Sequence, residues 1–319
     1  MDLLGTILWP LKWAVELILV AFHQLLTLTG MEAAAGITWV LSIVGLVLVI
    51  RAALIPIFVK QIKSQRRMME VAPQLKKIQD KYKGKRDQLS REAMSRETME
   101  LYKKTGTNPL ASCLPLLIQM PIFFSLFSVL NDAQRSEEGV GPLNEQLARQ
   151  FGEANLFGIA PLHQSIQGAL QEGGQELVVV IAVIMVVLMT ASQFITQLQI
   201  VSKNMSPEAK ASPTFKQQRI LLYILPLVFA FSGFAFPLGV MFYWLTSNIW
   251  TMIQQFIVIR NMPTPGSEAA KAREERLRRK GKLVEETNVA GETTLVEKKV
   301  VQRQQPVGKN RAKKQAGKK

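Results

Sequence analysis

The sequence predicts an all-α polytopic membrane protein, a bundle of five transmembrane helices with a cytoplasmic helical hairpin and a hydrophilic groove open to the cytoplasm. Three observations support this fold class. The 319-residue chain is 48% hydrophobic with a mean hydropathy of +0.13, although it ends in a long charged tail. Several apolar stretches are long enough to cross the hydrocarbon of a bilayer as helices. The segments between them alternate between basic and acidic, as a chain that crosses repeatedly should.

The amino-terminal segment, residues 1–35, is predicted to form an amphipathic helix. Lys12, Glu16 and His23 share one face at helical spacing, and apolar side chains supply the remainder. We interpret it as a helix lying in the outer membrane interface. Two alternatives stay open. The small residues 33–35 resemble the cleavage site of a signal peptide, although the amino end has no positive cluster, and the segment could also be a sixth span.

The core, residues 36–260, contains the five predicted spans. They lie at about 37–59, 109–130, 177–200, 220–235 and 237–259. The last two form one continuous apolar run that is long enough for two passes, with Gly233 and Pro237 placed where a tight turn is needed.

Between the first two spans, residues 60–107 are polar and helical in pattern, which predicts a hairpin of two helices. Gly84 interrupts the pattern, and the second helical stretch is expected at 87–104, before Thr105 and Gly106. Apolar residues recur at intervals of three and four in the first arm, at Met68, Val71, Leu75, Ile78 and Tyr82.

Lys and Arg are concentrated in alternate connections, which predicts the orientation. Residues 60–104 hold 14 basic residues against six acidic, whereas Asp132 to Glu176 hold two against seven. Short basic connections stay in the cytoplasm, so the external segment is 131–176 and the amino terminus is outside. The tail, 261–319, is then cytoplasmic, and its composition predicts a basic, disordered segment with a helix at 268–280.

Arg51 lies within the first span, and none of the predicted spans contains an Asp or Glu to neutralise it. A guanidinium cannot lose its charge, and at the centre of a bilayer it costs about 2.5–3.5 kcal/mol on insertion scales. The membrane surface near Lys60 is about 13 Å away along the helix, which is farther than the side chain readily reaches. We therefore expect Arg51 to be hydrated, or to pair with a group from another molecule.

Uncharged polar side chains are concentrated in the same cytoplasmic half of four spans, which predicts the groove. The alternative for any one of them is an ordinary helix–helix hydrogen bond. The residues that we assign to the groove beside Arg51 are Gln119, Gln193, Gln197, Thr246 and Asn248.

Several classes of chemistry lack the residues that they need, so we expect neither an enzyme nor a cofactor. The single cysteine, Cys113, excludes an internal disulfide and a CxxC site, and the two histidines fall outside the five spans. The chain has no GxxxxGK[ST] or GxGxxG run, so we expect no nucleotide as a partner. An intramembrane hydrolase would need a base, and the spans contain no His, Lys, Asp or Glu.

A hydrated groove with an unpaired cation would suit the passage of polypeptide. It shortens the apolar distance that a polar segment must cross, and Arg51 would attract carboxylates in that segment. The hydrophobic part of the client would leave sideways into the lipid bilayer, where burial supplies about 25 cal/mol per Å². The alternative function is a small-solute transporter or channel, which usually brings several ionisable coupling residues.

Specific motifs at these positions resemble the YidC/Oxa/Alb family of membrane protein insertases, in the bacterial form without a large external domain. The likeness covers about residues 37–260. Its elements are Arg51 with Pro56 and 60–63, the run 106–109 with 113–115, Gln119 with 121–123, and 242–244 with Asn248.

The resemblance implies a membrane protein insertase and chaperone in the bacterial plasma membrane. It matches Trp244 in the last span to the groove, together with Arg51 and Gln119, and it implies that the hairpin is needed for activity. The expected partners are nascent membrane proteins, the Sec translocon and, through the basic tail, the ribosome. A tail that is solvated and contacts only anionic lipid remains the alternative.

Overall fold

The computed structural model describes residues 3–85, 87–107, 114–135, 138–207, 233–287 and 293–297, together with Lys210, Ile224 and Phe231. The chain divides into two units, residues 1–270 and 271–319. The first unit is helical, which confirms the predicted fold class of a helical multi-pass membrane protein. Three described helical segments are long and apolar enough to cross a membrane: Gly5–Leu28, Gly36–Ser64 and Glu176–Asn204.

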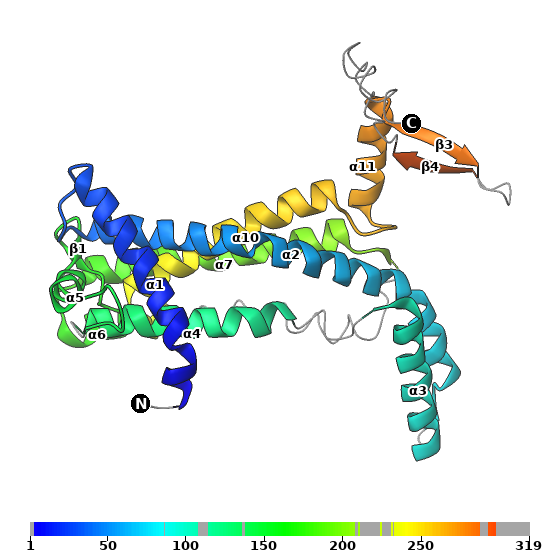
Figure 1. The fold of residues 1–319 in the computed structure, drawn as a ribbon, viewed down its shortest axis with the longest axis horizontal. Coiled ribbons are helices and arrows are strands. Elements are labelled where there is room, and N and C mark those ends of the chain that lie inside the picture. The colour runs from blue at the N-terminus through cyan, green and yellow to red at the C-terminus, as the bar shows by residue number, and fades with distance from the viewer. Residues whose placement is uncertain are drawn as a thin grey trace, which may run out of the picture. The chain divides into compact units, whose positions relative to one another are not determined.

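Four long helices of the first unit correspond to predicted spans (Figure 1). They are α2 (Gly36–Lys81), α4 (Leu114–Gln134), α7 (Glu176–Asn204) and α10 (Leu238–Asn261). Helix α10 packs against α7 and α2 and touches α4. The predicted span at 220–235 and the start of the predicted span at 109–130 lie mostly outside the described residues, so the number of five spans stays a prediction.

Helix α2 is longer than the predicted first span, because the span and the first arm of the hairpin are one helix of 46 residues. It continues through Pro56 and Pro73, each of which removes one backbone hydrogen bond. Figure 1 shows that the helix bends before it runs beside α3 (Gln88–Thr105). Proline inside a helix is a common cause of such bends.

Helix α3 forms the second arm of the hairpin at the predicted position. The Asp87 carboxylate caps its first turn by accepting a hydrogen bond of 2.8 Å from the Ser90 amide. Gly106 ends the helix in the left-handed conformation, with φ of 61°, which glycine adopts without steric cost.

Helix α1 (Leu3–Leu28) packs against α2 and α4, and Figure 1 shows it crossing them steeply. A helix lying in the membrane interface, as predicted, would present its polar face to water. The structure places this face inward instead, since Glu16 is 1% and His23 2% exposed. The outward face is apolar and includes Ile7, Leu17 and Leu25. A polar side chain can be buried in this way only when it finds partners. Those of Glu16 lie in the segment between α4 and α7, and those of His23 are the Ala33 carbonyl and Trp39 of α2.

The segment between α4 and α7 is folded, although its sequence offers only one short apolar stretch. It contains α5 (Glu145–Gly152), α6 (Ile166–Glu172) and the paired two-residue strands β1 (Asn155–Leu156) and β2 (Ala160–Pro161). Its core is formed by the buried side chains of Leu143, Phe151, Leu156 and Leu162.

The same segment holds the first turn of α10. The amide of Leu238 donates to the Gln164 carbonyl at 3.0 Å, and the amide of Gly239 donates to the Leu162 carbonyl at 2.9 Å. The first amides of a helix have no partner within the helix, so these bonds fix where α10 begins.

The second unit includes most of α11 (Glu268–Arg279), as predicted, but also two strands. Strands β3 (Leu283–Thr287) and β4 (Thr293–Glu297) pair antiparallel. These ten residues, whose Val and Thr content favours strands, differ from the disorder predicted for most of the tail. Residues 298–319 of the predicted tail lie outside the described residues.

Candidate functional site

The candidate site is a polar cluster where α2, α4 and α10 meet, beyond an apolar half of the bundle. The apolar half is tightly packed and includes Ile43, Leu46, Leu126 and Leu130, none of which is exposed. Such packing leaves little room for water. Any hydration of the bundle must therefore occur on the other side of these residues.

Arg51 extends from α2 and is the one charged side chain among the described residues of the cluster. It is half-buried, and none of the ion pairs among the described residues involves it. Its Cζ lies 6.0 Å from the centre of the Phe58 ring, which is at the outer limit of a cation–π interaction. The guanidinium is also within electrostatic reach of the Tyr243 hydroxyl.

Gln119 and Tyr243 connect α4 to α10 beside Arg51. The Gln119 Nε2 atom donates to the Tyr243 Oη atom at 3.4 Å, which is a long hydrogen bond. Tyr243 is only 4% exposed, so its phenol is presented to the interior of the bundle and not to lipid. Ser247, one turn further along α10, is also buried.

Tyr243 was missed by the sequence analysis, which assigned its neighbour Trp244 to the groove. The only available signal was the run 242–244 itself, in which tyrosine is the one residue with a hydroxyl. That this hydroxyl lies on the buried face of α10 is known only from the structure. Trp244 lies in an aromatic cluster, where its ring centre is 5.5 Å from that of Phe123 and 5.2 Å from that of Phe236.

The other predicted site residues have more local roles. Thr246 donates to the Phe242 carbonyl of its own helix at 2.8 Å. Asn248 reaches the Met189 carbonyl of α7 at 3.5 Å, at the limit of a hydrogen bond. Gln193 and Gln197 are half-buried on one face of α7, and neither bonds to Arg51 in the described part of the chain.

The structure thus brings Arg51, Gln119 and Tyr243 together and leaves the continuity of the predicted groove as a proposal. Hydroxyls that bond their own helix, such as those of Thr196 and Thr246, are partly satisfied without water. The Arg51 guanidinium is not satisfied without water, because the Tyr243 phenol and the Phe58 ring face cannot neutralise its charge. Among the described groups of the site, Arg51 is therefore the one that most requires water or an anion to compensate its charge.

The helices and this site define a multi-pass helical membrane protein with a polar cluster that contains one arginine inside its bundle. The family described as "60Kd inner membrane protein" matches residues 30–265. The chain belongs to this family.

Relatives in three bacteria are similar over most of the chain, and each is named membrane protein insertase YidC. The relative from Tropheryma whipplei is 46% identical over 317 residues, which is 98% of this chain and 97% of the relative. Those from Streptomyces avermitilis and Bifidobacterium longum are 45% and 37% identical, and the matches cover 85% and 96% of this chain and 61% and 95% of each relative.

Proposed function

We propose that this protein is a membrane protein insertase and chaperone, and that Arg51 is the central residue of its client site. The observation that carries the proposal is a cation inside the bundle with no carboxylate partner among the described residues. Family membership and the name shared by its relatives support the class of function. No nucleotide is required in this scheme, because burial of the client's apolar segment in lipid supplies the free energy.

The proposed mechanism uses a groove that is hydrated on the cytoplasmic side and closed by the apolar half of the bundle. Arg51 attracts an acidic or polar client segment, and Gln119 and Tyr243 offer it a donor and an acceptor. Gln193, Gln197 and Asn248 extend the polar lining along α7 and α10, and Trp244 adds an aromatic wall. The client's hydrophobic segment then leaves between the helices into lipid.

Reconstitution into liposomes separates this function from that of a solute transporter or channel. We expect insertion of a small client with one or two spans, in the absence of ATP. Flux of a small solute without insertion of the client would instead favour transport. The Sec translocon, which we propose as an additional partner, can be omitted and then added back in the same assay.

The role of Arg51 is tested by depleting the native protein and rescuing with variants. We expect Arg51→Lys to rescue substantially, because the charge is retained, and Arg51→Ala to rescue poorly. Arg149→Ala is a matched control, since it removes an exposed arginine from α5. Equal rescue by Arg51→Ala and Arg149→Ala would make the charge dispensable.

We propose that the basic tail binds translating ribosomes through ribosomal RNA, whose phosphates attract cationic segments. The truncation should end after Ala270, because residues 264–268 are attached to α7. The Thr264 amide donates to Asn204 at 2.8 Å, and Lys203 pairs with Glu268 at 3.0 Å. We expect the truncated protein to lose most cosedimentation with ribosomes at low salt. Unchanged cosedimentation would remove the tail's role.

A further inference from the structure

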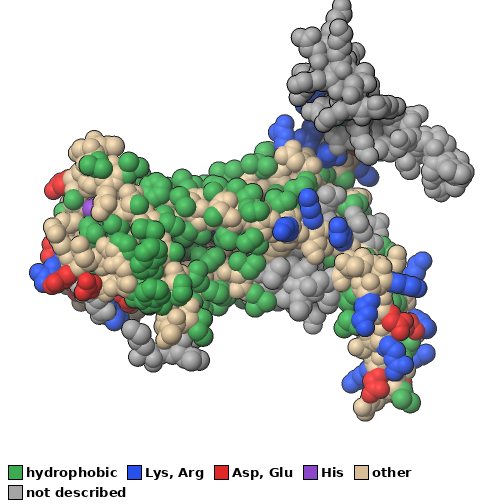
Figure 2. Space-filling view, in the orientation of Figure 1, with side chains coloured by type: hydrophobic (Ala, Val, Ile, Leu, Met, Phe, Trp, Pro, Cys, Tyr) green, Lys and Arg blue, Asp and Glu red, His purple; other side chains and the backbone are tan. Residues whose placement is uncertain are grey.

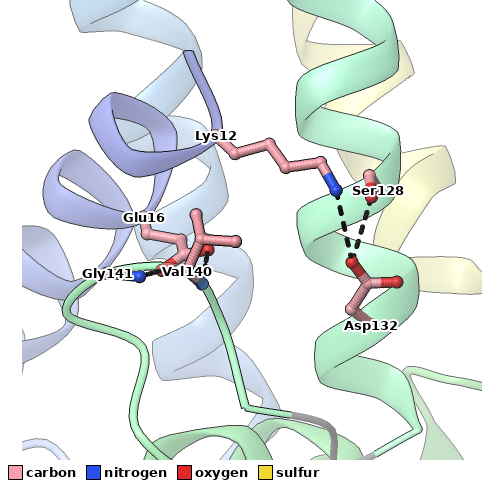
Figure 3. Close-up of polar contacts among 6 residues, drawn as sticks. All are labelled: Lys12, Glu16, Ser128, Asp132, Val140 and Gly141. Atoms are coloured by element: carbon pink, nitrogen blue, oxygen red, sulfur yellow. Dashed lines mark hydrogen bonds and ion pairs between the residues drawn. The ribbon is translucent and has the colours of Figure 1, made fainter. Parts of the chain in front are cut away.

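The buried carboxylate of Glu16 is the most unusual polar group outside the candidate site. Its oxygens accept hydrogen bonds from the amides of Val140 at 2.9 Å and Gly141 at 2.7 Å (Figure 3). The side chain is 1% exposed, so these amides replace its water. Hydrogen bonds to an ionised acceptor are among the stronger ones in proteins.

The turn at 139–141 fits closely around this carboxylate. A Cβ atom built on Gly139 would lie 2.5 Å from a Glu16 oxygen, and one on Gly141 would lie 2.5 Å from the Trp13 ring. A side chain at either position would therefore have to displace the Glu16 carboxylate or the Trp13 ring for the turn to approach α1 this closely.

Two further contacts connect α1 to its neighbours on either side of Glu16. Lys12 lies 3.8 Å from the Asp132 carboxylate of α4, which also accepts a hydrogen bond from Ser128 at 3.0 Å (Figure 3). His23 stacks on Trp39 of α2 with ring centres 3.9 Å apart and bonds to the Ala33 carbonyl at 2.9 Å.

The small residues that resemble a cleavage site are themselves built into the fold. Ala35 forms a bridge with Asn155, and Gly36 is buried against the backbone of Asn155 and Leu156, where a Cβ would approach to 2.5 Å. The Thr38 hydroxyl donates to the Glu32 carbonyl at 2.7 Å. A protease needs its substrate extended and accessible, and this segment is held at both ends.

We infer that residues 1–35 remain in the mature protein and that α1 is a permanently docked element, anchored by Glu16 to the external turn at 139–141. A signal peptide is removed after targeting, so it does not require specific contacts with the mature protein. Glu16 makes such contacts, because its buried carboxylate accepts hydrogen bonds from two amides more than 120 residues away. Docking explains why the polar face of α1 points inward and its apolar face outward.

Retention is tested on full-length protein with a carboxyl-terminal affinity tag, purified from membranes. We expect the intact mass to include residues 1–35. A mass that begins at or near residues 34–36 would overturn the inference.

Docking is tested by oxidative crosslinking in a Cys113→Ser background. The reporter pair is Trp13→Cys with Gly141→Cys, because the ring of Trp13 contacts the site of a Gly141 side chain and Glu16 is left intact. The matched control is Leu11→Cys with Gly141→Cys and Trp13→Ala. Leu11 lies on the opposite side of the helix and is exposed, and removing the Trp13 ring leaves the same room beside position 141 as in the reporter pair. We expect rapid crosslinking of the reporter pair alone, and equal crosslinking of both pairs would refute docking in this arrangement.

The anchor is tested by adding Glu16→Gln to the reporter pair. Glutamine presents one acceptor oxygen and one amide nitrogen, so one of the two backbone donors loses its partner. We expect crosslinking to slow by about tenfold, the effect of losing one charge-assisted hydrogen bond. An unchanged rate would show that Glu16 does not anchor α1. None of these measurements depends on insertion, so the inference and the proposed function can fail separately.

Discussion

Tyr243 shows how a single hydroxyl can connect two helices at the candidate site. The Gln119 side chain of α4 donates to it, and Arg51 of α2 lies within its electrostatic reach. Because the phenol is buried, water is a poor substitute for these partners. The hydroxyl of Thr246, three residues away, bonds its own helix, and in the described part of the chain it connects that helix to no other.

This contrast gives a prediction for two variants that each delete one hydroxyl. We expect Tyr243→Phe to lower insertion activity severalfold and to destabilise the protein by about 1 kcal/mol, because Gln119 loses a partner in the interior. Thr246→Val should leave activity close to that of the wild type. Complementation and thermal unfolding in detergent are the measurements, and equal effects of the two variants would contradict a special role for Tyr243.

Arg51 and Gln119 could be predicted from the sequence, whereas Tyr243 could not. An arginine in an apolar stretch is informative wherever it occurs, because its charge must be accommodated. Tyrosine in an aromatic run can serve as membrane-facing or core packing equally well. Whether Tyr243 faces the membrane or the core is decided by how α10 is rotated about its axis relative to α4. That rotation depends on contacts such as those of Leu238 and Gly239 with the segment between α4 and α7.

At the scale of elements, helix ends with local signals were predictable within a few residues. Helix α3 is delimited by Asp87 and Gly106, and α7 follows the apolar run 177–200. The continuity of α2 was missed because the sequence changes from apolar to polar at Lys60, whereas the helix continues without a break. The inward polar face of α1 was missed because its partners are far away in sequence, at Val140 and Gly141.

The hairpin of α2 and α3 is joined by a polar contact that predicts a pH dependence. Glu97 accepts hydrogen bonds from Lys81 and from the Tyr82 hydroxyl, the latter at 2.8 Å. The Lys81 bond lowers the pKa of Glu97 from its ordinary value of 4.5, and the Glu97 bond raises the pKa of Lys81 from 10.5. The lowered carboxyl pKa means that stabilisation is present above about pH 4.5 and is lost as pH falls through the pKa in the folded protein. The raised pKa of Lys81 means that this stabilisation is present below pH 10.5 and is lost as pH rises through the lysine pKa in the folded protein.

We therefore expect the two arms of the hairpin to stay together between these limits and to separate in acid. The distance between spin labels, one on each arm, measures this separation directly. Glu97→Gln should abolish the acid dependence, and Glu92→Gln, which changes an exposed carboxylate of α3, should preserve it. Because Lys81 is exposed, Glu97 is only half-buried and the pair is screened by salt, the effect should be small and should weaken further at high ionic strength.

At the scale of the molecule, charge is separated along the first unit. Figure 2 shows Asp and Glu side chains at the end that carries α5 and α6, Lys and Arg with a few acidic side chains among them on α3, and an apolar band between the two ends. The band matches the surface expected for helices in lipid, where exposed apolar side chains such as Val183, Val187 and Ile253 are at no disadvantage. Since basic segments are retained in the cytoplasm, the charge pattern predicts which end faces inward.

This orientation is the last prediction, and it determines on which side of the membrane the client site opens. In a Cys113→Ser background, Glu153→Cys places a thiol beside α5, and Lys103→Cys places one near the end of α3; both positions are exposed. A membrane-impermeant maleimide added to intact cells should label the first position readily and the second only after permeabilisation. Both substitutions remove one charge from an exposed position, so neither should change the topology by itself. If the second position were labelled in intact cells, the basic hairpin would be outside, and a client arriving from the cytoplasm would meet the packed apolar half of the bundle instead of Arg51.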